Sequence, residues 1–202
     1  MKECLILGKP NSGKTLFLLN FAEYLGYREL EMIVEEPGGN RHRKSYDLAG
    51  ARMTLVSPTP HHTRALQVVQ LKVPKGKSRC DVALTDTTGL CEGIHESATI
   101  RRSMVQTLRR LREIQVVLHL IDGSRVGTVG APEAMGDLDH QLARFATGRL
   151  GYAIIVNKMD LPGAGAGLAS VRSTFPYHVI IPMSALRKQG FREVKAFVGR
   201  FF

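Results

Sequence analysis

Short apolar runs alternate with segments of helical periodicity along the chain. The apolar runs predict six strands, at residues 3–7, 65–73, 79–86, 115–121, 152–156 and 179–182. Helical patterns occupy residues 14–25, 97–112, 132–146, part of 168–174 and 191–201. This alternation is typical of a mostly parallel sheet with helices on both faces. We therefore expect a three-layer α/β fold with a six-stranded sheet.

The second and third of these strands are separated by very few residues. The connecting segment, 74–78, is rich in proline, glycine and lysine, and it is short enough to make an antiparallel hairpin. The second strand is thus expected to be the antiparallel member of a mixed sheet.

One long stretch, at about residues 28–60, gives no clear pattern. It contains short strand-like pieces around Met32 and Met53 and a basic run at 41–44. The pattern alone does not define the order of this stretch. We expect a single domain that spans residues 1–202.

Residues 8–15 read Gly-Lys-Pro-Asn-Ser-Gly-Lys-Thr, which matches the phosphate-binding loop that ends in Gly-Lys-Ser or Gly-Lys-Thr. Backbone amides in such a loop point at phosphate, and the positive end of the following helix dipole adds attraction. Lys14 is expected to neutralise the β and γ phosphates, and the Thr15 hydroxyl to ligate Mg²⁺. The nucleotide-binding residues expected here are Asn11, Ser12, Gly13, Lys14 and Thr15.

A second motif, Asp-Thr-Thr-Gly, ends the strand at 79–86. Asp86 can reach the Mg²⁺ shell from this position, and the amide of Gly89 can meet the γ-phosphate. The sequence therefore predicts that both residues sense the third phosphate.

A third motif, Asn-Lys-Met-Asp, follows the strand at 152–156. Asp160 can accept hydrogen bonds from N1 and the exocyclic amine of guanine, whereas adenine would leave a buried carboxylate unsatisfied. A fourth segment after the last strand offers backbone amides to the guanine O6. The expected base-binding residues are Asn157, Lys158, Asp160, Ser184, Ala185 and Leu186.

In order and approximate spacing, these four motifs resemble those of the translation-factor class of GTPases, and within it the Era-like group. The resemblance covers nearly the whole chain. Three details carry it: Pro10-Asn11 in the phosphate loop, an Asp-Thr-Thr-Gly-Leu segment similar to Asp-Thr-Pro-Gly-Leu, and the antiparallel second strand. It implies a Mg²⁺-dependent switch that binds GTP and GDP and hydrolyses GTP by in-line attack of water, with Lys14, Asn11 and Gly89 acting in catalysis.

The resemblance also implies a first-switch threonine that closes over Mg²⁺ just before the second strand. Thr63 matches that position, with Thr59 and Thr54 as alternatives. Its separation from Lys14 is about twice that usual in the family, so the resemblance implies an insertion, a small lobe at about residues 28–60, in or before the first switch. Together with Thr15 and Asp86, Thr63 completes the predicted metal ligands. His61 and His62, beside it, are either metal or proton-transfer residues or simply solvated.

Two departures from the family pattern affect the activity expected. Thr88 replaces the usual proline, and Leu90 stands where Ras-like enzymes carry the glutamine that orients the attacking water. Hydrolysis should therefore be slow, with the water positioned by the backbone, another residue or another protein. The alternative is a nucleotide-regulated binding module with negligible hydrolysis. Asn11 matches an asparagine that helps some relatives to hold K⁺, so potassium stimulation is a further hypothesis.

The chain carries 28 Lys and Arg against 18 Asp and Glu, a formal charge of +10. Such a charge favours polyanionic partners and suggests contact with RNA or the ribosome. Arginines cluster on the predicted helix at 97–112, at positions 101, 102, 109, 110 and 112. Either they are a solvated helix face or they contact nucleic acid.

Cysteine content and hydropathy bear on the compartment. Cys4, Cys80 and Cys91 are widely spaced and odd in number, which fits neither a disulfide framework nor a paired-ligand zinc site, so we expect reduced thiols. No apolar run approaches the eighteen or so residues of a membrane span. We expect a cytoplasmic protein without membrane insertion, and the sequence leaves open a nucleotide-dependent dimer or a protein partner.

Overall fold

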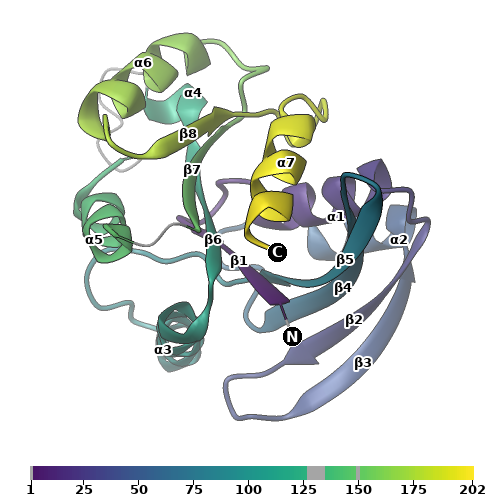
Figure 1. Cartoon of the computed structure of the whole chain (residues 1–202). Coiled ribbons are helices and arrows are strands. Elements are labelled where there is room, and N and C mark those ends of the chain that lie inside the picture. Colours follow the sequence, from purple (N-terminus) through teal and green to yellow (C-terminus); the bar gives the residue numbers. More distant parts are fainter. Residues whose placement is uncertain (1, 127–134, 149–150) are drawn as a thin grey trace.

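Figure 1 shows the computed structural model of the chain, which describes residues 2–126, 135–148 and 151–202. Its strands form one sheet in the order β3-β2-β4-β5-β1-β6-β7-β8. The strands are β1 (Lys2–Gly8), β2 (Glu29–Glu35), β3 (Arg41–Asp47), β4 (Leu66–Lys75), β5 (Ser78–Asp86), β6 (Val116–Asp122), β7 (Tyr152–Asn157) and β8 (Val179–Pro182). The helices are α1 (Lys14–Tyr24), α2 (Leu48–Leu55), α3 (Ala98–Glu113), α4 (Gly123–Val126), α5 (Asp137–Ala146), α6 (Ala164–Thr174) and α7 (Phe191–Phe201).

The sheet confirms the predicted fold class, but the described part of the chain holds eight strands and not six. Strands β5, β1, β6, β7 and β8 are neighbours and run parallel. Strand β4 pairs with β5 in the antiparallel direction down to Lys75 and Ser78, so the predicted hairpin is confirmed. The two additional strands, β2 and β3, both come from residues 28–60. Strand β3 gave no strand signal because its residues are mostly charged and exposed, without an apolar face.

The insertion extends the sheet at its β4 edge. Strand β2 pairs antiparallel with both β3 and β4, and Met32 of β2, opposite Val69 of β4, is fully buried. The strand expected around Met32 is thus confirmed. The strand expected around Met53 is wrong, because Asp47 accepts a hydrogen bond from the Gly50 amide and caps a helix, α2. The small lobe expected for this stretch is accordingly a continuation of the main sheet.

Side chains alternate between the two faces of the sheet, and helices cover both (Figure 1). On one face, Phe17 and Phe21 of α1 and Phe191 of α7 form a cluster of tilted and edge-on rings in the same core as Ile6. On the other face, Leu5 lies in a second core with residues of α3, α5 and α6. Strand β1 is therefore apolar on both faces, as a central parallel strand must be.

Two predicted helices have boundaries that differ by more than one residue, and one short helix was not predicted. Helix α5 begins at Asp137 and not at residue 132, and residues 132–134 lie outside the described part. The poorly defined helix near 168–174 is longer, starting at Ala164, and the short helix α4 had no periodic signal. None of the described helices is both long and apolar enough to cross a lipid bilayer.

We predict that Met32→Ala lowers the free energy of unfolding by about 2–5 kcal/mol, because it leaves a cavity in the core under the inserted strands. The matched control is Met53→Ala, whose side chain is 87% exposed and should change stability by less than about 0.5 kcal/mol. Urea denaturation of both variants measures the difference. If Met32→Ala changes the free energy of unfolding as little as Met53→Ala does, the Met32 side chain does not stabilise the core.

Candidate nucleotide site

The motif residues lie at one edge of the sheet because neighbouring parallel strands end there. Gly8 ends β1, Asp86 ends β5 and Asn157 ends β7. In open α/β sheets, ligands bind outside these carboxyl ends. A cavity of about 410 Å³ opens at this edge, lined among others by Asn11, Lys14, Thr15, Gly89 and Lys158.

The phosphate loop depends on glycines at points of close approach. A Cβ at Gly8 would lie 2.2 Å from the carbonyl oxygen of Leu120, and one at Gly13 would lie 2.4 Å from Nδ2 of Asn157. Gly13 is also left-handed, with φ of 93°, where it starts α1. Lys14 is nearly buried and donates to the carbonyl oxygens of Gly8, at 3.1 Å, and of Lys9, at 2.8 Å. Its ammonium group thus lies across the loop that surrounds a phosphate in such proteins.

The three predicted metal ligands come together. The Thr15 hydroxyl donates to Oδ2 of Asp86 at 2.6 Å and lies 3.2 Å from the hydroxyl of Thr63. Oδ1 of Asp86 is buried and has no hydrogen-bond partner in the described part of the chain. Carboxylate and hydroxyl oxygens suit Mg²⁺, which keeps several ligands from water and phosphate, so this donor set fits the ion. No group of three or more His, Cys, Asp or Glu that could hold a metal occurs among the described residues.

Burial shifts the ionisation of both charged groups in this cluster. It raises the pKa of Asp86 to about 6, while Lys14 and hydrogen bonds from Thr15 and the Thr87 backbone act in the opposite direction. It lowers the pKa of Lys14 to about 8, with Asp86 opposing that change. Both groups are thus destabilised in their charged forms. A metal ion would offset the first and a polyphosphate the second.

The segment after Asp86 packs closely on the phosphate loop. A Cβ at Gly89 would lie 2.6 Å from the backbone nitrogen of Pro10, so only glycine fits there. The amide of Leu90 donates to the carbonyl oxygen of Gly8 at 3.1 Å, and the Leu90 side chain is 1% exposed in the core with Leu5 and Leu7. Leu90 therefore cannot contact a water molecule in the cavity.

The side chain of Asn157 ties the base-binding motifs to the phosphate loop. Its Nδ2 donates to the carbonyl oxygen of Ser12 at 2.8 Å, and its Oδ1 accepts from the amide of Ala185 at 2.9 Å. Asn20 of α1 donates in turn to the carbonyl oxygen of Ala185. Leu186, the last residue of that motif, is more than half exposed.

The other two predicted base-binding residues of the Asn-Lys-Met-Asp motif, Lys158 and Asp160, are held by side chains that the sequence did not single out for this role. Oδ1 of Asp160 accepts from the Ser184 hydroxyl at 2.5 Å, so Ser184 contributes its side chain as well as its predicted amide. Lys158 has a positive φ of 64° and pairs with Asp122, at the end of β6, at 2.6 Å. The only sequence signal for Asp122 is its place at the end of a buried strand.

Residues 55–59 and 61–63 form one wall of the cavity, which is where the first switch is expected. Of the three candidate threonines, Thr63 reaches Thr15, whereas Thr59 lies on the wall and is exposed. Thr54 is in α2, where its carbonyl oxygen bonds the ring of His62. Nδ2 of Asn11 donates to the carbonyl oxygen of Pro58 at 2.8 Å, which occupies the nitrogen of this amide and not its oxygen.

Buried polar atoms without a partner gather at this site. In the described part of the chain there are seven such side-chain atoms, and four of them are Ser12 Oγ, Asp86 Oδ1, Thr88 Oγ1 and His61 Nδ1. Each unsatisfied buried group costs about 1–3 kcal/mol. His61 lines the cavity, and the other three are next in sequence to residues that line it. This clustering indicates a site completed by a ligand.

Sequence reasoning missed an ionic cluster behind the phosphate loop. Lys9 lies 2.9 Å from Glu92 and 3.3 Å from Asp139 of α5. Glu92 follows residues 86–90, the segment expected to act as the second switch. Asp139 also accepts from the amide of Gly136 and bonds Nε2 of the buried His119. Charged residues scattered over distant segments give no sequence pattern, so only the fold brings them together.

A mixed, mostly parallel sheet with a phosphate loop at its edge, oxygen ligands suited to Mg²⁺ and a guanine motif defines the class of P-loop GTPases. The family described as "50S ribosome-binding GTPase" matches residues 44–158, more than half of the chain, and the chain belongs to this family. The matched range includes Thr63, Asp86 and Asn157. The expectation of an Era-like P-loop GTPase is thereby confirmed.

Curated relatives and solved structures agree with this placement. GTPase Obg of Lysinibacillus sphaericus is 32% identical over 116 residues, 55% of this chain and 26% of that protein, so the chain spans about a quarter of its length. GTPase Obg of Desulfatibacillum aliphaticivorans is 26% identical over 67% of this chain and 39% of its own.

Among solved structures, an Aquifex aeolicus Era variant bound to GDP·AlF4⁻ has a TM-score of 0.67 at 18% identity, covering 100% of this chain and 57% of its own. Era in complex with MgGDPNP and a segment of 16S ribosomal RNA has a TM-score of 0.66 at 20% identity, covering 99% and 56%. These likenesses show a shared fold. The binding roles of individual residues in this chain stay predictions.

We predict that Asp160→Asn lowers the affinity for GTP by about 100-fold, because two charge-assisted hydrogen bonds to guanine are lost. The amide should instead favour xanthine, whose extra carbonyl can accept a hydrogen bond. Calorimetric titration with GTP and with xanthosine triphosphate measures both affinities. Asp81→Asn is the control, since Asp81 is exposed on β5 well before Asp86. Unchanged GTP affinity in Asp160→Asn would contradict the predicted base contact.

Proposed function

We propose that this chain binds GTP and GDP with Mg²⁺, hydrolyses GTP slowly by in-line attack of water, and acts as a conformational switch in which residues 1–202 work as one G domain. The observation that carries the proposal is the contact of Thr63 with Thr15 beside Asp86. It supports a first switch able to close over a metal at the phosphate loop. Because Leu90 is apolar and buried, we expect a low intrinsic rate.

In this proposal, the residues act by position and charge. Lys14 and the backbone amides of the phosphate loop neutralise charge on the β and γ phosphates, and the amide of Gly89 meets the γ-phosphate. A bound Mg²⁺, held by Thr15, Thr63 and Asp86, would contribute further charge neutralisation. No covalent intermediate is needed.

Single-turnover hydrolysis of GTP tests the proposal. We expect measurable turnover in the wild-type chain and a loss of at least about 100-fold in Lys14→Ala, since an ammonium group directed at the transferring phosphate is removed. Tight binding without any turnover would favour the alternative, a nucleotide-regulated binding module with negligible hydrolysis, whose bound state permits a partner to bind. The buried, apolar Leu90 is the observation that keeps this alternative open.

The same assay in potassium and sodium buffers tests the role of Asn11. The oxygen of its side-chain amide can ligate a monovalent cation next to the phosphates, so faster turnover in potassium is our proposal. Equal rates in the two buffers would remove it.

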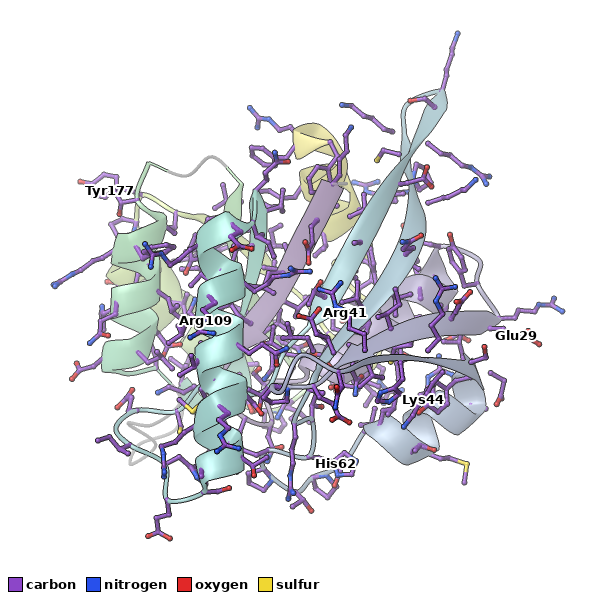
Figure 2. All side chains as sticks on the ribbon, turned by 90° about the horizontal axis from the view of Figure 1, so that it is seen from below. Glu29, Arg41, Lys44, His62, Arg109 and Tyr177 are labelled. Carbon is purple, nitrogen blue, oxygen red and sulfur yellow. The ribbon has the colours of Figure 1, made fainter. Side chains whose placement is uncertain are left out.

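We further propose RNA, in the context of the ribosome, as the partner of a basic surface on α3. Arg102 and Arg109 are exposed two helical turns apart and line a groove of about 580 Å³ between α3 and the turn that joins β2 and β3. Figure 2 shows Arg109 and Arg41 of β3 on the same side of the molecule. The family description and the Era complex with ribosomal RNA agree with this choice.

Other arginines of α3 have structural partners. Arg110 pairs with Glu3 at 2.9 Å, and Arg101 donates to the carbonyl oxygens of His95 and Glu96. The proposed contact therefore rests on Arg102 and Arg109. A nucleotide-dependent dimer, a protein partner and the cytoplasmic location stay predictions.

We predict that Arg102→Ala with Arg109→Ala weakens binding to ribosomal RNA. The slope of log affinity against log salt should fall by about 2, one unit for each phosphate that an arginine no longer neutralises. Titration of fluorescent RNA at several salt concentrations measures the slope. Arg192→Ala with Arg200→Ala removes the same charge from exposed positions on α7 and is the control. If the two double variants change the slope equally, RNA binding depends on net charge and not on a specific contact with α3.

A further inference from the structure

The buried position of Leu90 raises the question of which side chain orients the attacking water. The polar residues that line the cavity are mostly engaged elsewhere. The Asn11 amide donates to Pro58, the Thr87 hydroxyl donates to the carbonyl oxygen of Ile6, and the His62 ring bonds the carbonyl oxygen of Thr54. Lys158 pairs with Asp122, and Thr63 contacts Thr15.

His61 differs from these residues. It lines the same cavity and is partly buried, and its Nδ1 is shielded from solvent with no hydrogen-bond partner in the described part of the chain. Two other orphaned atoms, Asp86 Oδ1 and Ser12 Oγ, belong to the metal and phosphate positions of the site. A buried imidazole nitrogen without a hydrogen-bond partner in the described residues indicates that a bound molecule, such as water, supplies that partner.

The ring of His61 is also held in place. Residue 61 has a left-handed φ of 55°, which is unusual for a residue other than glycine. The ring packs edge-on against His95, with centroids 4.9 Å apart and planes at 74°. Nδ1 of His95 accepts from the amide of Ser97, the residue that caps α3. The packing thus joins the first switch to the segment that follows the second switch.

We propose that His61 is a catalytic residue of GTP hydrolysis, and that its imidazole hydrogen-bonds the attacking water in place of the side chain that Leu90 cannot provide. The inference rests on the proposed function. The water oxygen forms a bond to the γ-phosphorus as the bond from that phosphorus to the β–γ bridging oxygen breaks. GDP leaves with the electron pair, the water protons end on inorganic phosphate, and His61 is unchanged.

Because His61 packs on His95, the orientation of the His61 imidazole, and so of the attacking water, depends on both switches. Thr63, two residues after His61, closes on Thr15 when the first switch is in the position described here. His61 is then carried to the cavity, and His95 limits the directions its ring can take. Hydrolysis would therefore require the first switch and the segment after the second switch to be in place together.

Three substitutions separate a role of the imidazole nitrogens from simple packing. His61→Ala removes both, His61→Phe keeps an aromatic ring against His95, and His61→Gln restores a polar group able to bond water. Since a positioned group of this kind contributes about 100-fold or more, we expect single-turnover rates to fall about 100-fold in His61→Ala and His61→Phe. We expect partial recovery in His61→Gln.

Binding of GDP and of a non-hydrolysable GTP analogue should stay within about threefold of wild type in all three variants, because a group that acts on the water adds little to ground-state affinity. His42→Ala, on β3 and outside the cavity lining, is the control for loss of a histidine. Thermal unfolding verifies that each variant is folded. Because His61 lies in a loop and is only partly buried, we expect all three substitutions at this position to be tolerated.

A wild-type rate in His61→Phe would overturn the inference, since the ring and not its nitrogens would then matter. A fall in rate matched by an equal fall in affinity for the GTP analogue would also overturn it, by making His61 a binding residue. If the wild-type chain hydrolyses GTP and His61→Ala does so at the same rate, this inference is wrong and the proposed function is unaffected. Absence of wild-type turnover would remove the proposed hydrolysis, and this inference with it.

Discussion

The nucleotide site depends on one buried amide, the side chain of Asn157. It donates to the phosphate loop through Ser12 and accepts from the last loop through Ala185, so three segments far apart in the sequence share a single rigid junction. A buried amide is stable only when its donors and acceptors are satisfied, and here the two loops satisfy it. The distance between the phosphate end and the base end of the site is therefore set by a side chain that is itself engaged by the protein on both sides.

Where the phosphates are expected to bind, the folded chain buries two charged groups and, among the described residues, several unpaired polar atoms at a cost in free energy. Lys14 and Asp86 are both buried, burial disfavours the charge on each, and several polar atoms around them lack partners in the described part of the chain. Such an arrangement is costly in the chain alone and becomes favourable when a metal and a polyphosphate supply the missing charges and hydrogen bonds. In the proposed function, the third phosphate would supply part of this missing charge and hydrogen bonding, and its loss on hydrolysis would favour a different position of the switches.

Residues 28–60 connect the phosphate site to the edge of the sheet and to α1. Their hairpin continues the main sheet beside β4, and their helix α2 ends just before the first switch, which forms a wall of the cavity. Arg52 of α2 donates to Asn20 of α1, and Asn20 also holds the loop at Ala185. The helix that precedes the first switch is therefore bonded to the helix that follows the phosphate loop.

The sequence by itself determined the fold class, the antiparallel hairpin and the four motifs, because each is a local pattern: apolar periodicity, a short polar turn, or a loop whose residues are contiguous. It left Thr63, Thr59 and Thr54 as alternatives, and only the tertiary structure brought Thr63 to Thr15. The sequence also missed β3, whose charged residues leave no periodic signal on an exposed edge strand, and misread Met53, because a single capping aspartate decided in favour of a helix. Asp139, Glu92 and the packing of His61 on His95 had no signal at all. These pairings join residues distant along the chain, and their geometry exists only once the sheet has set where each strand ends.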